Sequence, residues 1–428
     1  MKTSIKAAIA ATGILISAGQ AFSAARLTYL LKQRPQPLTW SSESFPVHYV
    51  LDRDAAARFE GGAATVQKAM ESWGGVTGSA AKFEADQIAS ISAGKDGKNS
   101  ISLKDKLYEG SGFLAFTTTF YDDNARIFES DIQVDPSVAA GGNVNLQKLI
   151  AHEAGHMLGL DHSAVVASIM YPFVGNDSYA GLDSDDRIAT AAIYPKSGRG
   201  GATLRGAVRG PTGAIFAAQV VALNESGAAI ASALTDATGS FELNQVPAGR
   251  YRLYAEPLDG PVDPQNFSGV WRDARKAEFR TEFLRNGEVI EVRDGSVTER
   301  LELTNDGLPA TLNPRWVGAF PAFSTQVKLG SSAAVVRAGE SVSIALGGDG
   351  VVGGLTEFEI PNPGFKRVSE FKYGSNYLWA TFQVSATVAP GSFVLVAKNG
   401  NETAALTGAI RIEGSSEPGS SGRRRAAR

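Results

Sequence analysis

Three of the four histidines in this 428-residue chain lie in one short segment, HEAGHMLGLDHS at residues 152–163. His152 and His156 are spaced so that, on a helix, both side chains lie on one face, one turn apart. Gly159 predicts the end of that helix, because glycine adopts the left-handed turn without strain. His162 follows the turn, and three neutral imidazoles leave one tetrahedral position for water, as in a catalytic zinc site. The spacing therefore predicts that His152, His156 and His162 bind one Zn²⁺ ion.

Glu153 stands next to the first histidine, where the H-E-x-x-H pattern places a glutamate that acts as a base and not as a ligand. The plain alternative is a helix that carries histidines on a polar face. The rest of the chain contains a single histidine, His48, so chance clustering is a poor explanation. The long form H-E-x-x-H-x-x-G-x-x-H is much more specific than the short one. We therefore expect Glu153 to be a catalytic general base.

The region around these residues resembles the matrixins, the branch of the metzincin proteases that includes the matrix metalloproteinases. The long histidine motif is the metzincin signature, and Met170 in the segment SIMYP is similar to the methionine turn beneath the metal. Ser163, directly after the third histidine, is a matrixin trait. Asn145 predicts the cap of the helix that carries the histidines. Asp183 predicts the cap of a second helix, which ends in IYP at residues 193–195 and resembles the closing helix of the family. The resemblance reaches back to about residue 38, through a first strand and the apolar stripe of a first helix.

This resemblance implies a secreted endopeptidase that hydrolyses peptide bonds of protein or peptide substrates with a zinc-activated water. Met170 would form an apolar floor under the histidines, and Asp161 and Ser163 would lie close to His162. Phe113–Phe120 is the candidate for an edge strand that pairs with substrate, although an ordinary sheet strand is an equally open alternative. The residues expected to bind substrate are Leu114, Ala115, Phe116 and Pro172.

The chain departs from the animal matrixins in three respects. It contains no cysteine, so latency through a cysteine bound to zinc is excluded for this sequence. Only His48 is left over, so the second, structural zinc of those enzymes is not expected. Val174 stands where those enzymes usually carry a tyrosine in the wall of the specificity pocket, so their substrate preference does not transfer.

The remaining sequence predicts a multidomain protein, with an α+β metzincin catalytic domain (residues 26–196) followed by two all-β sandwich domains. A glycine-rich break at residues 197–201 precedes short alternating strands. Residues 202–305 resemble the carboxypeptidase regulatory-like domain, and residues 306–414 resemble bacterial immunoglobulin-like modules. Residues 415–428 form a basic tail that we expect to be disordered. We expect the two β domains to be separable from the enzyme and to bind a surface or polysaccharide target.

Residues 1–25 read as a secretory signal peptide, with two lysines, a short apolar run and small residues before the cleavage site. No later stretch is long and apolar enough for a membrane helix. The net charge of −3 gives no reason to expect nucleic acid as a partner. Calcium would suit an acidic cluster, but a solvated acidic surface is the favoured interpretation. The cluster comprises Asp122, Asp123, Glu129, Asp131 and Asp135.

Two other functions remain open from the sequence. The chain could be a cell-surface or matrix binding protein whose metal domain is incidental, because two of the three expected domains resemble binding modules. It could also be a zinc hydrolase of another kind, such as a deacetylase. Glu153 argues against the first alternative, since a purely structural metal site needs no base, and Met170 argues against the second.

Overall fold

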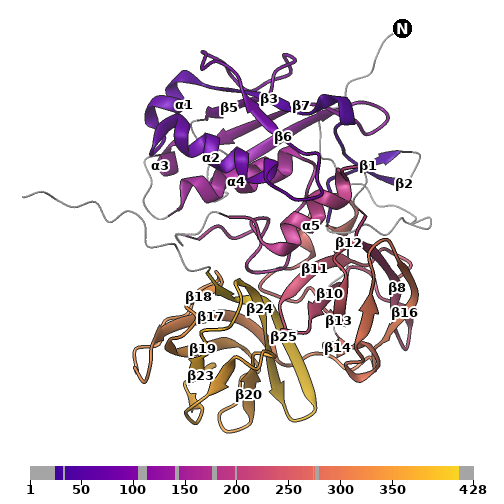
Figure 1. Ribbon diagram of the computed structural model, residues 1–428, viewed down its shortest axis with the longest axis vertical. Coiled ribbons are helices and arrows are strands. Elements are labelled where there is room, and N and C mark those ends of the chain that lie inside the picture. The colour runs from indigo at the N-terminus through magenta and orange to yellow at the C-terminus, as the bar shows by residue number, and fades with distance from the viewer. Residues whose placement is uncertain are drawn as a thin grey trace, which may run out of the picture.

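The computed structural model describes residues 25–31, 34–104, 113–139, 144–175, 181–197, 200–272, 274 and 279–413. The expected basic tail, and the expected signal peptide apart from Ala25, lie outside these residues. Figure 1 shows a mixed N-terminal domain above two β domains that lie side by side. Among the described residues, no helix combines the length and the apolar character needed to cross a membrane.

The N-terminal domain is organised around a five-stranded sheet with the order β4-β3-β5-β7-β6. Four of the strands run parallel, and β6 pairs antiparallel with β7 at one edge. This arrangement confirms that the segment proposed to pair with substrate is an edge strand. The strands are β3 (Val47–Leu51), β4 (Phe83–Ala85), β5 (Ser100–Leu103), β6 (Ala115–Tyr121) and β7 (Ile127–Val134), and a separate hairpin joins β1 (Thr28–Leu31) to β2 (Arg34–Pro37).

Helices α2 and α4 pack against each other, and α4 carries the first two histidines of the motif. The apolar stripe predicted for the first helix is buried in α2, and Trp73 Nε1 donates a hydrogen bond of 2.9 Å to the carbonyl of Ala151 in α4. Asn145 caps α4 by accepting from Lys148 N, and Asp183 caps α5 together with Asp186 in a capping box, so both predicted caps are confirmed. The helices are α1 (Arg53–Arg58), α2 (Gly62–Gly74), α3 (Pro136–Ala139), α4 (Leu146–Met157) and α5 (Ser184–Ile193), with a 3₁₀ turn η1 (Ser42–Ser44).

Gly159 ends α4 as the sequence predicts. Its φ of 87° is in the left-handed region, which glycine adopts without the clash of a β-carbon. A β-carbon at this position would also lie only 2.3 Å from the carbonyl oxygen of Leu38. The turn therefore requires glycine for two independent reasons, and it is this turn that sends the chain back toward His162.

Among the described residues after 197, most of the regular structure is β-strand, in four sheets, and the helical segments are the 3₁₀ turns η2 (Pro264–Asn266), η3 (Gly269–Trp271) and η4 (Leu284–Asn286). The second domain has the sheets β11-β10-β13-β14 and β12-β8-β16, and the third domain has β17-β19-β23-β21 and β18-β25-β24-β20. The predicted change to sandwich-like β domains is therefore seen. The strands are β8 (Ala202–Gly210), β9 (Gly213–Ala214), β10 (Gln219–Asn224), β11 (Ala229–Leu234), β12 (Ser240–Val246), β13 (Gly249–Glu256), β14 (Glu282–Phe283), β15 (Ile290–Val292), β16 (Val297–Thr304), β17 (Asn313–Pro321), β18 (Ala334–Val336), β19 (Ser341–Asp349), β20 (Thr356–Glu359), β21 (Phe365–Arg367), β22 (Lys372–Tyr373), β23 (Tyr377–Val384), β24 (Gly391–Asn399) and β25 (Glu402–Ile412).

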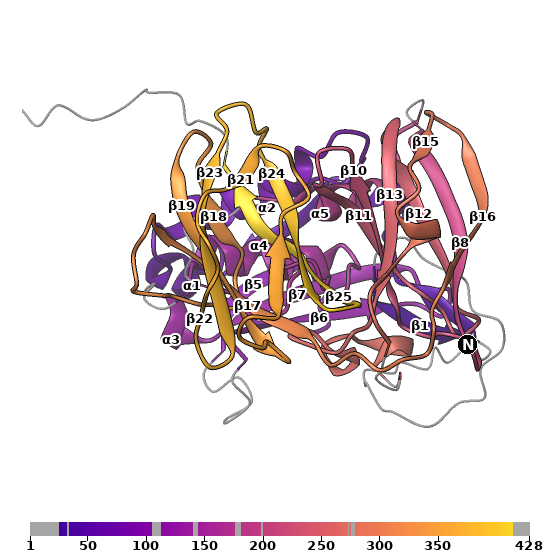
Figure 2. The ribbon, with the colours of Figure 1, turned by 90° about the horizontal axis from the view of Figure 1, so that it is seen from below.

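The β domains pack against the N-terminal domain, which the expectation of separable domains did not include. In both views α5 lies against the second domain, where it packs on β11 and β12 (Figures 1 and 2). Val166 and Tyr171, next to the methionine turn, belong to a buried apolar cluster made largely of third-domain residues. Arg411 in β25 donates a hydrogen bond of 2.5 Å to the carbonyl of Ala167. This interface could not be predicted from the sequence, because the polar groups in the interface are small residues and single charges that follow no regular spacing.

The seam between the two β domains contains a buried carboxyl group. Glu256, at the end of β13, accepts a hydrogen bond of 2.5 Å from the hydroxyl of Thr407 in β25. Burial raises the pKa of Glu256 from 4.5 to about 8. The folded protein therefore keeps a proton that the unfolded chain releases, and the resulting stabilisation is complete below pH 4.5 and lost as the pH rises through about 8.

We expect Glu256→Gln to remove this pH dependence, because glutamine keeps the acceptor oxygen and cannot ionise. The variant should melt within about a degree of the parent at pH 5 and a few degrees higher at pH 9. Thermal unfolding followed by circular dichroism at both pH values measures the difference. Glu302→Gln, at an exposed position in the second domain, is the matched control and should follow the parent throughout. An equal melting temperature for Glu256→Gln and the parent at pH 9 would contradict the assignment.

Candidate functional site

The three histidines of the motif converge at the end of α4. His152 and His156 project from the helix, and His162 comes back to them after the Gly159 turn. Their ring centroids form a nearly equilateral triangle, with separations of 4.8, 4.9 and 5.2 Å. The potential ligand atoms all lie within 4.8 Å of one another. In the described part of the chain this is the one group of three or more such side chains that is close enough to hold a metal.

Each imidazole is oriented by a backbone carbonyl. His152 Nδ1 lies 2.7 Å from the carbonyl oxygen of Ile169, and His156 Nδ1 lies 2.9 Å from that of Leu160. His162 Nδ1 contacts the carbonyl oxygen of Asn266. Since a carbonyl only accepts, each Nδ1 must carry the proton, and the lone pair is then on Nε2. All three rings thus have the tautomer in which Nε2 can bind a metal.

The charge state of the rings also suits a metal. Burial lowers the pKa of His152 well below its usual range, and the neighbouring histidines lower it further. Burial likewise lowers the pKa of His156 to about 4, with His162 as the next contribution. Neutral imidazole is the form that coordinates Zn²⁺. The donor set of three imidazoles, each with Nε2 available, therefore fits a zinc site with one position open.

Glu153 lies beside the triangle and is almost completely buried, with 5% of its surface exposed. The hydroxyl of Thr117, on the edge strand β6, donates a hydrogen bond of 2.5 Å to Glu153 Oε2. Burial raises the pKa of this carboxyl to about 7, and the hydrogen bond from Thr117 opposes the rise. A carboxyl group whose pKa is near neutrality can both accept and release a proton at the pH of most extracellular fluids.

The segment around Met170, which was predicted to be a methionine turn, packs against α4, the helix that carries His152 and His156. Met170 is buried against α4 at Gly155, where an added β-carbon would lie 2.2 Å from the methionine sulfur and 2.8 Å from the Trp73 ring. Asp186 of α5 holds the turn, since it accepts hydrogen bonds from Ile169 N at 2.8 Å and from the Ser168 hydroxyl at 2.5 Å. The closing helix therefore fixes the floor of the site.

The residues expected to bind substrate lie on two sides of the site. Ala115 begins β6 and is buried, Leu114 and Phe116 are half-buried, and Pro172 directly follows the methionine turn. The residue of β6 that contacts Glu153 is Thr117, which the sequence analysis did not single out. The only available signal was its position on a candidate edge strand. Hydroxyl residues are common in strands, so the sequence offered no reason to choose it.

Two carboxylates of the acidic cluster, Glu129 and Asp131, accept hydrogen bonds from backbone N–H groups. Glu129 accepts from the backbone N–H groups of Asp96 and Gly97 at 3.0 and 2.7 Å. Asp131 accepts from those of Gly94 and Ser100, both at 2.9 Å. These two carboxylates are buried, which corrects the expectation of a solvated acidic surface for them. Their role in the structure is to hold the loop around residues 94–100.

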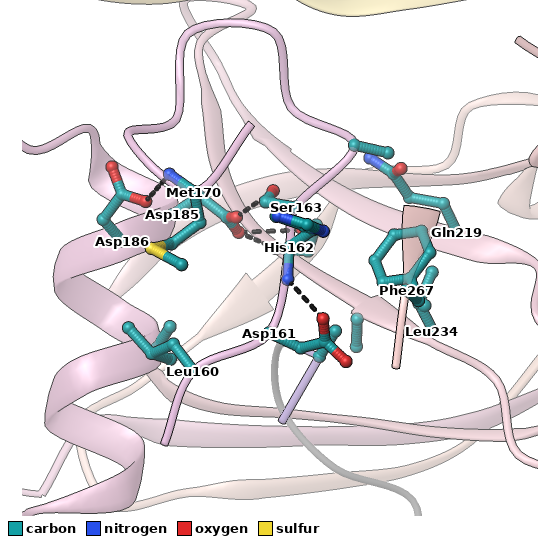
Figure 3. Close-up of a pocket in the computed structure, with 15 residues that line it drawn as sticks. Leu160, Asp161, His162, Ser163, Met170, Asp185, Asp186, Gln219, Leu234 and Phe267 are labelled. Carbon is teal, nitrogen blue, oxygen red and sulfur yellow. Dashed lines mark hydrogen bonds between the residues drawn. The ribbon is translucent and has the colours of Figure 1, made fainter. Parts of the chain in front are cut away.

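A turn of the second domain reaches the metal site, and no sequence pattern predicted it. Residues 263–268 include the 3₁₀ turn η2 (Pro264–Asn266). Phe267, Gln219 and Leu234 of the second domain face His162 and Asp161 across a small cavity (Figure 3). Asp161 Oδ2 accepts from Ser268 N at 2.9 Å and from the Ser268 hydroxyl at 2.6 Å. The wall of the site is thus shared between two domains.

Two family models match this chain. Residues 44–195 match the matrixin family, and residues 203–260 match the carboxypeptidase regulatory-like domain. Both of these resemblances are confirmed, and the chain contains a matrixin domain followed by a carboxypeptidase regulatory-like domain.

Individual relatives match over short segments. Karilysin from Tannerella forsythia is 40% identical over 58 residues, which cover 13% of this chain and 11% of karilysin. Matrix metalloproteinase-21 from Xenopus laevis is 34% identical over 90 residues, covering 21% of this chain and 14% of that protein. The chain thus spans about a tenth to a seventh of the length of these relatives. The major pilin subunit BcpA of Bacillus cereus aligns over 50% of this chain and 67% of its own, with 12% identity and a TM-score of 0.15, which is too low to support an argument about fold.

Proposed function

We propose that the matrixin domain is a secreted zinc-dependent endopeptidase. The observation that carries the proposal is the triangle of three imidazoles, each oriented by a backbone carbonyl, with the buried carboxyl group of Glu153 on the same helix. His152, His156 and His162 are the proposed zinc ligands. Zn²⁺ held there would lower the pKa of a water molecule and polarise the scissile carbonyl.

The protein's own groups would then move the protons. Glu153 accepts a proton from the attacking water and donates it to the leaving amine as the peptide bond breaks. Thr117 holds the carboxylate in place through its hydroxyl. The substrate backbone pairs with β6, the last strand in the order of the sheet, as an added strand, which places its carbonyl next to Glu153. Met170 packs below the ligands and takes no part in proton transfer.

Export is proposed from the N-terminal sequence alone, with its lysines, apolar run and small residues. Calcium binding stays a prediction for the other members of the acidic cluster. The carboxylates of Glu129 and Asp131 already accept hydrogen bonds from backbone N–H groups. A surface or polysaccharide target for the β domains stays a proposal based on their resemblance to binding modules.

Cleavage of an unbiased peptide library by the full chain tests the proposed activity. We expect cleavage that a chelator abolishes and added Zn²⁺ restores. The alternative, a binding protein with an incidental metal domain, would bind zinc and leave the whole library intact. That outcome would overturn the proposed function, and the cleavage profile would otherwise define the residues preferred on each side of the bond.

Replacement of a single ligand should abolish stable zinc binding. We expect His156→Ala to contain well under 0.1 zinc ion per chain after dialysis, against about one in the parent, because two imidazoles alone bind zinc weakly. Elemental analysis by mass spectrometry provides the measurement. His48→Ala is the matched control. The side chain of His48 is about half exposed, its Nδ1 lies 3.0 Å from Asp86 Oδ1, and it is distant in sequence from the three proposed ligands. Full zinc content in His156→Ala would contradict the ligand assignment.

A further inference from the structure

The third proposed ligand has a different environment from the other two. The carbonyls that orient His152 and His156 belong to Ile169 and Leu160, within the matrixin domain itself. The carbonyl that orients His162 belongs to Asn266, in the second domain. His162 also follows the glycine turn and does not lie on α4, so no helix fixes its position. Its orientation therefore depends on contacts that the other ligands do not need.

Asp161 connects the histidine loop to the same turn. Its Oδ1 accepts from His162 N at 2.8 Å, and its Oδ2 accepts from the backbone N–H and the hydroxyl of Ser268. Asp161 is 3% exposed, so these hydrogen bonds are shielded from water. A buried carboxylate with such donors is costly to leave unpaired. The loop before His162 is thus tied to Ser268, and the ring of His162 is tied to Asn266.

Hydrogen bonds within the second-domain turn hold its conformation. Asp263 and Asn266 form a capping box, in which Asp263 accepts from Gln265 N at 2.8 Å and Asn266 Oδ1 accepts from Asp263 N at 2.9 Å. Phe267 is buried beside the site, and the ring nitrogen of Trp271 donates to the carbonyl of Thr235 at 3.3 Å. The turn is therefore anchored to the β-sandwich and can transmit its position to the histidine.

We infer that the turn Asp263–Ser268 of the carboxypeptidase regulatory-like domain is a positioning element of the zinc site, which holds His162 through Asn266 and Asp161. This inference rests on the zinc site of the proposed function. It assigns to the second domain a part in building the metal centre, in addition to any binding role. Groups that orient a metal ligand typically contribute a factor of about 10–100 to metal affinity.

Zinc affinity of the full chain tests the inference without any measurement of peptide cleavage. Competition with a chromophoric chelator should give a zinc Kd about 10-fold or more higher than the parental value for Ser268→Ala, which removes the hydroxyl that donates to Asp161. Asn266→Ala keeps the carbonyl that contacts His162 but removes the side-chain oxygen that caps the turn, and it should also raise the Kd. Ser296→Ala is the matched control, because Ser296 makes a turn hydrogen bond of 2.6 Å with Arg293 in the same domain, outside the histidine turn. It should keep the parental Kd. All three metal-free variants should keep the parental circular dichroism spectrum at the temperature of the zinc titration, which separates positioning of the ligand from loss of the fold.

A double-mutant cycle shows whether Ser268 acts through Asp161. If it does, Asp161→Ala combined with Ser268→Ala should bind zinc no more weakly than Asp161→Ala alone. The visible spectrum of the Co²⁺-loaded protein should also change in Ser268→Ala and stay parental in Ser296→Ala. Parental zinc affinity in both turn variants, or fully additive losses in the cycle, would overturn the inference. A parent that binds zinc and cleaves no peptide would overturn the proposed function and leave the inference standing.

Discussion

Glu153→Ala is expected to lower peptidase kcat by about 10²- to 10⁴-fold while about one zinc ion per chain remains bound. The three imidazoles that form the proposed ligand set stay in place, and the group that would move the proton is removed. The decisive comparison is kcat on a short peptide together with zinc content, measured on the same protein preparation.

The control for this variant is Glu71→Ala, which removes an exposed carboxylate from α2, where Glu71 accepts from Gln67 at 2.7 Å. It should retain parental activity and zinc. Loss of zinc from Glu153→Ala would mean that Glu153 contributes to metal binding. Parental activity in Glu153→Ala would exclude it as the base. Either result contradicts the division between ligands and base on which the proposed mechanism depends.

A chain that ends after residue 197 is expected to lose soluble folding or, where it folds, to bind zinc at least about 10-fold more weakly than the full chain. This expectation reverses the one drawn from the sequence. Removal of the β domains would uncover Val166 and Tyr171. It would also remove the hydrogen-bond donors that the second domain supplies to Asp161 and Asp185. Newly exposed apolar surface promotes association, and the loop that carries His162 would lose its external support.

Soluble yield, monomer content by size-exclusion chromatography and zinc Kd together measure this effect. The control chain ends after residue 413 and keeps every contact that the structure describes. If the chain ending at residue 197 were monomeric and had the zinc Kd of the full chain, the β domains would be dispensable for the metal centre. The view of an enzyme with separable appendages would then be correct.

The sequence by itself was sufficient for the local part of the site. A helix repeat brings His152 and His156 together, a glycine with positive φ returns the chain, and Asn145 and Asp183 cap the helices at the predicted residues. These features depend on neighbours within one or two turns, so spacing and residue type are enough to predict them. The edge position of β6 was predicted by resemblance to the family.

Only the tertiary structure decided which distant groups complete the site. Thr117 meets Glu153 across 36 residues, and Asn266 meets His162 across 104. Both contacts depend on how a strand and a second domain pack against α4 and its following loop, and a single hydroxyl or backbone carbonyl leaves no periodic trace in a sequence. The same reason explains why the contacts between the matrixin domain and the β domains were not predicted. A domain linker is visible as composition, whereas a buried interface between domains is defined only by packing.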